Sequence, residues 1–132
     1  SYLKKGGYIL SKEDKEAPDL ILMGSGSEVS LLIEAKAKLK DLGIDARVVS
    51  MPNMNVFEDQ PKEYKEQVLP KSVEARISVE AGITMSWYRY LGNKGIAIGI
   101  DTFGASAPIE KLMQHFGLST ENIVEKAMEV IK

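Results

Sequence analysis

The chain has no cysteine and a single histidine, His115, among its 132 residues. The lack of cysteine excludes disulfide scaffolds, thiolate metal sites and cysteine nucleophiles, and it favours a reducing compartment such as the cytoplasm. One histidine without cysteine cannot build a zinc site, so we predict no metal-binding residue. No apolar run reaches the roughly 18–20 residues of a membrane span, and no basic-then-apolar signal segment opens the chain, so we expect no membrane partner.

An excess of charge of either sign is also missing. The chain has 17 Lys and Arg residues against 19 Asp and Glu residues, which gives a net charge of −2. This balance supplies no general attraction to nucleic acid, and we expect no nucleic-acid partner. Hydrophobic residues make up 44% of the chain, and its length suits one domain, so we predict a single domain over residues 1–132. Because the first residue is serine rather than methionine, we expect a processed chain or a piece of a longer protein.

Short apolar runs alternate with amphipathic segments. Strands are predicted at Tyr8–Leu10, Leu20–Met23, Asp45–Ser50, Ala75–Val79 and Ile96–Ile100. Helices are predicted at 29–42, 57–68, 85–91, 109–116 and 123–131. Near-continuous apolar strands that alternate with helices are typical of a parallel sheet covered on both faces. We therefore predict an α/β fold, a three-layer α/β/α sandwich with a mostly parallel five-stranded sheet, in which residues 1–18 supply an antiparallel edge strand and a loop.

A glycine-rich turn joins the second predicted strand to the first long helix. It consists of Gly24, Ser25, Gly26 and Ser27. Open α/β sheets bind ligands at such turns, and helix N-termini attract anions. However, a dinucleotide fingerprint needs a third glycine where this chain has Val29, and Ser25 with Glu28 has the spacing of a capping box. Helix capping is the favoured interpretation, and a weak anion site is the alternative.

A second turn follows the strand at Ile96–Ile100. It contains Asp101 and then Gly104, Ala105 and Ser106, directly before Pro108. Ser106 is suited to cap a helix that Pro108 begins, and a polar ligand site is again the alternative. The candidate anion or ligand site therefore comprises Gly24, Ser25, Gly26, Ser27, Gly104, Ala105 and Ser106.

Glu80 lies at the end of the fourth predicted strand. A carboxylate there is a candidate general base, with Asp101 at the same sheet edge, but a salt bridge to Arg76 or Arg89 is the favoured interpretation. The chain offers no nucleophile–base pair, so we predict no catalytic residue.

Two apolar groups are candidates for contact with other parts of a protein. Trp87, Tyr88 and Tyr90 are expected to pack in the core and to contact a partner. A surface toward neighbouring domains is expected at Met51, Pro52, Met54 and Phe57.

Several sequence blocks in one order resemble the C-terminal domain of transketolases. The blocks are residues 24–29, 46–52, 68–70, 79–82 and 103–108. The resemblance covers about Leu20 to Ile131, and it implies a mixed five-stranded sheet with one antiparallel strand. Transketolases are transferases that move a two-carbon ketol unit between sugar phosphates in the pentose phosphate pathway. They use thiamine diphosphate and a divalent cation such as magnesium.

The resemblance also implies what this chain lacks. In the family the cofactor-binding and catalytic residues lie in two preceding domains, and no Gly-Asp-Gly motif followed by Asn-Asn occurs here. No catalytic or cofactor-binding residue carries over. We expect the isolated chain to be inactive and to pack against the preceding domains within a homodimer. The alternatives are an anion- or nucleotide-binding regulatory module and a freestanding small enzyme that uses Glu80 or Asp101.

Overall fold

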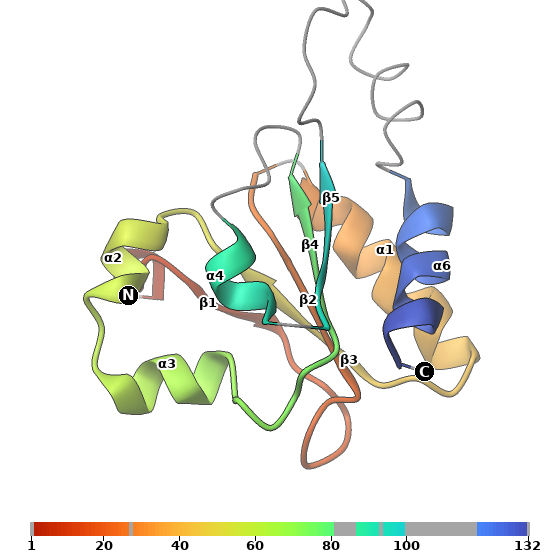
Figure 1. Ribbon diagram of the computed structural model, residues 1–132, viewed down its shortest axis with the longest axis horizontal. Helices are drawn as coiled ribbons and strands as arrows, with labels where there is room; N and C mark the ends of the chain where they lie inside the picture. Colours follow the sequence, from red (N-terminus) through yellow and green to blue (C-terminus); the bar gives the residue numbers. More distant parts are fainter. Residues whose placement is uncertain (1, 27, 81–86, 93, 100–118, 132) are drawn as a thin grey trace, which may run out of the picture.

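A mixed five-stranded sheet forms the centre of the molecule (Figure 1). The computed structural model describes residues 2–26, 28–80, 87–92, 94–99 and 119–131. The strands are β1 (Tyr8–Ser11), β2 (Leu20–Gly24), β3 (Ala46–Ser50), β4 (Arg76–Glu80) and β5 (Ile96–Gly99). Their order is β1-β3-β2-β4-β5, with β1 antiparallel to β3 and every other pair parallel. The predicted α/β sheet and its antiparallel edge strand are confirmed.

Helices cover both faces of the sheet (Figure 1). The described helices are η1 (Tyr2–Lys5), α1 (Glu28–Asp41), α2 (Met54–Glu58), α3 (Lys62–Val68), α4 (Tyr88–Leu91) and α6 (Thr120–Ile131). Helices α1 and α6 pack on one face, and α2, α3 and α4 lie on the other. The predicted helix at 109–116, with His115, lies outside the described residues. No described helix has both the length and the apolar character to cross a membrane.

Two hydrophobic cores result from the alternation of side chains along the strands. Toward α1 and α6 the buried residues are Leu20, Leu22, Leu32, Ala35, Leu39, Ala46, Val48, Ile77, Val79, Ile98, Ile123, Ala127 and Val130. Toward α2, α3 and α4 they are Ile21, Met23, Val49, Met51, Phe57, Val68, Leu69, Val73, Trp87, Tyr90 and Leu91. Every residue of β2 and β3 is buried, and β2 is accordingly apolar throughout, whereas β3 also buries the polar side chains of Arg47 and Ser50.

The buried face of α1 differs from the one expected. The helical spacing in the sequence predicts a buried face of Val29, Leu32, Ile33, Leu39 and Leu42. Leu32 and Leu39 are fully buried as predicted, together with Ala35, at the 3–4-residue spacing of one helix stripe, but Ile33 and Leu42 are 40% and 57% exposed.

The sequence predicts that Gly43 ends the first long helix and that Ser119 caps the last one, and both predictions are confirmed. Gly43 has φ of +84°, and the amides of Gly43 and Ile44 donate to the carbonyls of Lys40 and Leu39, as in a Schellman motif. At α6, Ser119 Oγ accepts from the amide of Asn122 at 3.2 Å.

The single helix predicted over residues 57–68 is wrong, because two short helices occupy this part of the chain. Asn53 begins α2, and its Oδ1 accepts from the amide of Val56 at 3.2 Å. Helix α2 ends at Glu58, and α3 starts after Pro61. Proline lacks an amide hydrogen and clashes with the preceding turn, so a helix continuing through Pro61 would be strained.

A buried ion pair connects the loop before β2 to the sheet. Arg47 on β3 donates through Nε and Nη2 to both carboxylate oxygens of Glu13, at 2.8 and 2.7 Å. The two side chains are only 7% and 0% exposed. Arg47 Nη1 also donates to the carbonyls of Gln67 and Val68 at the end of α3. One guanidinium therefore joins three segments that are distant in sequence.

Replacing Glu13 with Gln tests this interaction. Burial alone would raise the pKa of Glu13, but hydrogen bonds from Arg47 and from the Glu13 backbone outweigh it and hold the pKa below 4.5. The stabilising contribution is thus present above pH 4.5 and is lost as the pH falls through the lower pKa of the folded state. Glu13→Gln should cost about 3–5 kcal/mol near neutral pH, because it leaves a buried cation without its counter-charge.

Urea unfolding of the wild type and of Glu13→Gln between pH 7 and pH 3 would measure the contribution of this ion pair to the free energy of unfolding. The difference in unfolding free energy between wild type and variant should shrink as the medium becomes more acidic. A difference that does not change with pH would contradict the assigned role of the Glu13 carboxylate.

Candidate functional site

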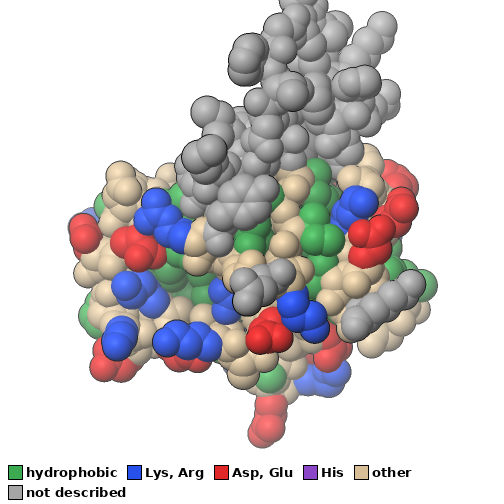
Figure 2. Space-filling view, viewed as in Figure 1, with side chains coloured by type: hydrophobic (Ala, Val, Ile, Leu, Met, Phe, Trp, Pro, Cys, Tyr) green, Lys and Arg blue, Asp and Glu red, His purple; other side chains and the backbone are tan. Residues whose placement is uncertain are grey.

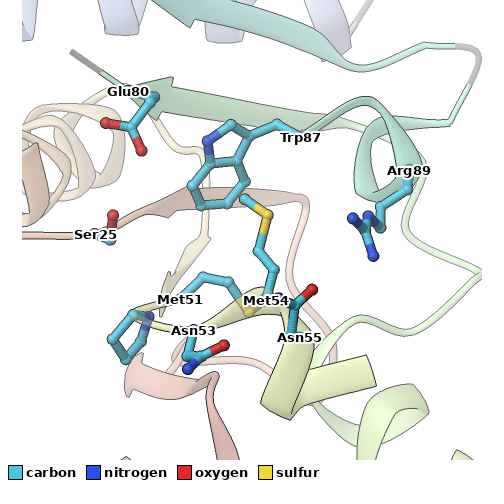
Figure 3. A pocket seen from close by; sticks show the side chains of 9 residues that line it. Ser25, Met51, Asn53, Met54, Asn55, Glu80, Trp87 and Arg89 are labelled. Atoms are coloured by element: carbon cyan, nitrogen blue, oxygen red, sulfur yellow. The ribbon is translucent and has the colours of Figure 1, made fainter. Parts of the chain in front are cut away.

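A cavity of about 340 Å³ lies at the carboxyl edge of the parallel strands (Figure 3). Its lining comprises Ser25, Met51, Pro52, Asn53, Met54, Asn55, Glu80, Trp87 and Arg89. The residues come from the segments after β2 and β3, the end of β4, helix α2 and the region of α4. This edge is where open α/β sheets bind their ligands.

The turn at residues 24–26 contributes one side chain to this cavity, Ser25. Gly26 has φ of +60°, and α1 begins at Glu28. A capping box on Ser25 would need a helical Gly26, so that interpretation is wrong. Glu28 nevertheless lies buried in the first turn of α1, where a carboxylate interacts favourably with the helix dipole.

Gly24 lies in a crowded position rather than at a ligand. A Cβ there would approach Leu32 Cδ1 to 2.9 Å and the carbonyl oxygen of Val79 to 3.1 Å. The glycine thus permits close packing of α1 against the sheet. Of the other candidate residues, Ser27, Gly104, Ala105 and Ser106 lie outside the described part of the chain, so the predicted anion site stays a prediction.

Glu80 is half-buried and lines the cavity, on the same side of Trp87 as Ser25 (Figure 3). Arg76 is not its partner, contrary to one of the two salt bridges expected. Arg76 donates instead to four carbonyls, those of Leu69, Pro70, Val73 and Tyr90. Asp101 lies outside the described residues, so the suggested pairing of the two carboxylates stays a prediction.

Core packing of the aromatic group is confirmed for two of its members. Trp87 is 1% exposed and Tyr90 is 5% exposed. The Tyr90 ring meets Phe57 edge-to-face at 5.8 Å between centroids, and its hydroxyl donates to Glu58 at 2.8 Å. Burial, and then the neighbouring Glu58 carboxylate, raises the pKa of Tyr90. The hydroxyl therefore stays protonated at neutral pH and acts as a donor.

The expected surface toward neighbouring domains is only partly correct. Met51 and Phe57 are 2% and 1% exposed, because both belong to the core beneath α2. Pro52 is exposed and Met54 is half-buried, and both line the cavity.

Asn53, Asn55 and Arg89 line this cavity without having been predicted to do so. The position of the two asparagines depends on α2, a helix that the sequence pattern placed three residues too late. Asn53, directly before an apolar segment, was the available signal, because asparagine is a preferred N-cap residue.

The cavity carries little chemistry of its own. Among the lining residues that the structure describes, the charged ones are a carboxylate, Glu80, and a guanidinium, Arg89. Within the described ranges, no group of three His, Cys, Asp or Glu side chains could hold a metal ion.

Comparison with known proteins identifies the fold. A family model described as "Transketolase-like TK C-terminal domain" matches residues 6–119. The chain belongs to the transketolase C-terminal domain family. It is 46% identical over 129 residues to the transketolase of Bacillus subtilis and 48% identical over 130 residues to the chloroplastic transketolase of Craterostigma plantagineum. A solved transketolase from Leishmania mexicana superposes with a TM-score of 0.86 at 36% identity over 98% of this chain.

The chain is much shorter than these relatives. Each of the two sequence matches covers 98% of this chain, but only 19% of the Bacillus protein and 25% of the Craterostigma protein. The solved structure is likewise matched over 18% of its length. The transketolase resemblance and the predicted fold are both confirmed by these matches.

Gly26→Ala tests whether the turn before α1 depends on glycine. A Cβ at residue 26 would meet only Glu28 Oε2, at 3.6 Å, so the cost comes from the positive φ rather than from a clash. We expect a loss of about 1–2 kcal/mol in unfolding free energy, measured by urea denaturation. Gly26→Asn is the matched control and should lose less, because asparagine tolerates this conformation. Equal losses in both variants would contradict this explanation.

Proposed function

We propose that this chain is the C-terminal domain of a transketolase, and that it forms one domain over residues 1–132. The whole enzyme would be a transferase that moves a two-carbon ketol unit between sugar phosphates. This proposal rests on sequence similarity: nearly the entire chain matches about one fifth of the length of one known transketolase and one quarter of the length of another. It also favours a domain of the enzyme over a freestanding small enzyme and over a separate regulatory module.

The catalytic steps of the parent enzyme belong to its other domains. The family's cofactor is thiamine diphosphate with a divalent cation such as magnesium. The described residues do not fit this group, because they contain no cluster of metal-binding side chains and their carboxyl-edge cavity has a single carboxylate. We therefore derive no reaction step within this chain, and we assign cofactor binding to the two preceding domains.

The role of this chain in the whole enzyme would be packing and dimerisation. The carboxyl edge of the sheet supports this role, since it combines exposed Pro52 and Asn55 with half-buried Met54 around a cavity. A partner surface that fills this cavity would bury apolar area beside Trp87. The cytoplasmic location expected from the sequence stays a proposal, and the Craterostigma relative carries a chloroplastic name.

The isolated chain should neither bind thiamine diphosphate nor transfer ketol units. Titration calorimetry with thiamine diphosphate and magnesium should show only heats of dilution, because the residues that the structure describes contain no cluster of side chains that could hold the metal ion of the pyrophosphate–metal group. The same chain joined to the two preceding domains of its parent is the positive control. Micromolar binding by the 132-residue chain alone would overturn the proposal.

Asn55→Arg tests the packing surface. Asn55 is exposed on α2 at the cavity, so a long cation there should leave folding intact and obstruct a docked domain. We expect its association with the separately produced preceding domains to weaken about tenfold or more. Size-exclusion chromatography with light scattering would measure this association.

Ser72→Arg is the matched control. Ser72 is exposed and lines a different cavity, in the loop that leads into β4 at the opposite edge of the sheet. The Ser72→Arg substitution adds the same charge as Asn55→Arg and should leave the association with the preceding domains unchanged. Equal weakening by both variants would point to net charge, and no weakening by Asn55→Arg would remove the carboxyl edge as the docking surface.

A further inference from the structure

Two adjoining cavities outside the carboxyl-edge site share three cationic residues. The first has a volume of about 590 Å³ and lies between α2, α3 and α4, and the second has a volume of about 300 Å³ and lies beside α4. Lys71, Arg76 and Arg89 line both. Lys62 and Lys65 add further positive charge to the larger cavity, and Lys94 adds it to the smaller one. In Figure 2 several Lys and Arg side chains lie close together on the side of the molecule that α3 occupies.

Arg76 brings the other two cations toward each other. Its Nη2 donates to the carbonyl of Pro70 at 2.7 Å, directly before Lys71 in the chain. Its Nη1 donates to the carbonyl of Tyr90 at 2.7 Å, directly after Arg89. The backbone next to each neighbouring cation is therefore bound to the same guanidinium.

The charge of Arg76 is not neutralised by a carboxylate. All of its hydrogen bonds in the described part of the chain go to neutral carbonyls. Burial lowers the pKa of Arg76, and the more distant Glu66 offsets this only partly. Carbonyl oxygens accept from four of its five N–H groups, but the net positive charge remains, half-buried in the wall of both cavities.

Four carboxylates also line these cavities, and two of them, Glu58 and Glu66, are already engaged, whereas Glu63 and Glu74 are exposed at the rim. Glu58 accepts from the Tyr90 hydroxyl at 2.8 Å, and its Oε1 lies 3.9 Å from Lys65 Nζ. Glu66 accepts from the backbone amide of Lys71 through both oxygens, at 3.2 and 3.1 Å. Among the described residues, no carboxylate lies within 4.0 Å of the charged nitrogens of Lys71, Arg76 or Arg89.

We propose that a phosphoryl group binds where these two cavities meet, held by Lys71, Arg76 and Arg89. Arg89 can bind phosphate oxygens in pairs through its planar guanidinium fork, and Lys71 adds an ammonium group. Arg76, whose N–H groups are mostly bound to carbonyls, adds its positive charge behind them. The larger cavity leaves room for an organic substituent next to Phe57, Leu69 and Tyr90. The ligand is therefore an organic phosphomonoester, and inorganic phosphate is its minimal form.

Amide NMR spectra of the 132-residue chain, titrated with sodium phosphate and with phenyl phosphate at constant ionic strength, would test the proposal. Saturable shifts should appear at the amides of Lys71, Val73 and Arg89, and phenyl phosphate should bind more tightly than inorganic phosphate. The double variant Lys71→Gln/Arg89→Gln should bind both about tenfold more weakly or worse, because it removes two charge-assisted contacts. Both side chains are exposed, so the variant should fold.

Lys38→Gln/Lys40→Gln on α1 is the matched control, since it removes two exposed positive charges elsewhere. This variant should bind as the wild type does. Equal weakening in the two double variants would mean non-specific attraction and would overturn the proposal. Shifts that do not saturate, or an acidic peptide such as hexaglutamate binding at the same amides more tightly than phenyl phosphate, would overturn it as well.

Discussion

The ion pair between Arg47 and Glu13 determines how the first part of the chain joins the rest. A buried charge without a partner is costly, so the loop that carries Glu13 must stay against β3 whenever Arg47 is buried. The same loop is held a second time, because the amides of Asp14 and Lys15 donate to the carboxylate of Asp45 at 2.9 and 2.7 Å. The chain thereby leaves β1 and enters β2 along one path, which positions an antiparallel edge strand on an otherwise parallel sheet.

Sequence patterns predicted the features that depend on local chemistry. Each of the five strands lies at or next to a predicted strand, because apolar residues dominate the buried strand positions even where a polar side chain such as Arg47 interrupts them. The end of α1 at Gly43 and the start of α6 after Ser119 were also predictable, since few residues other than glycine favour a positive φ, and serine is a preferred N-cap. The family resemblance likewise rested on short blocks at strand ends and turns.

The features that depend on neighbouring elements were not predictable in this way. Ile33 and Leu42 follow a helical spacing, but which stripe of α1 is buried depends on the position of α6. Met51 and Phe57 appeared to be surface residues because nothing in the sequence showed that α2 and α3 fold over them. Ser25 and Glu80 were expected near the carboxyl edge because each lies at or directly after the end of a strand. Asn55 and Arg89 were not expected there, because they lie in helices whose position depends on packing against the sheet.

Arg76 connects two helix ends that would otherwise be independent. It binds carbonyls at the end of α3 and the last turn of α4, and it is itself anchored in β4. Moving either helix would leave a half-buried guanidinium short of acceptors, which is unfavourable. The backbone on both sides of these cavities is consequently fixed in place, so a molecule that settles between the two helices loses little backbone entropy in ordering it.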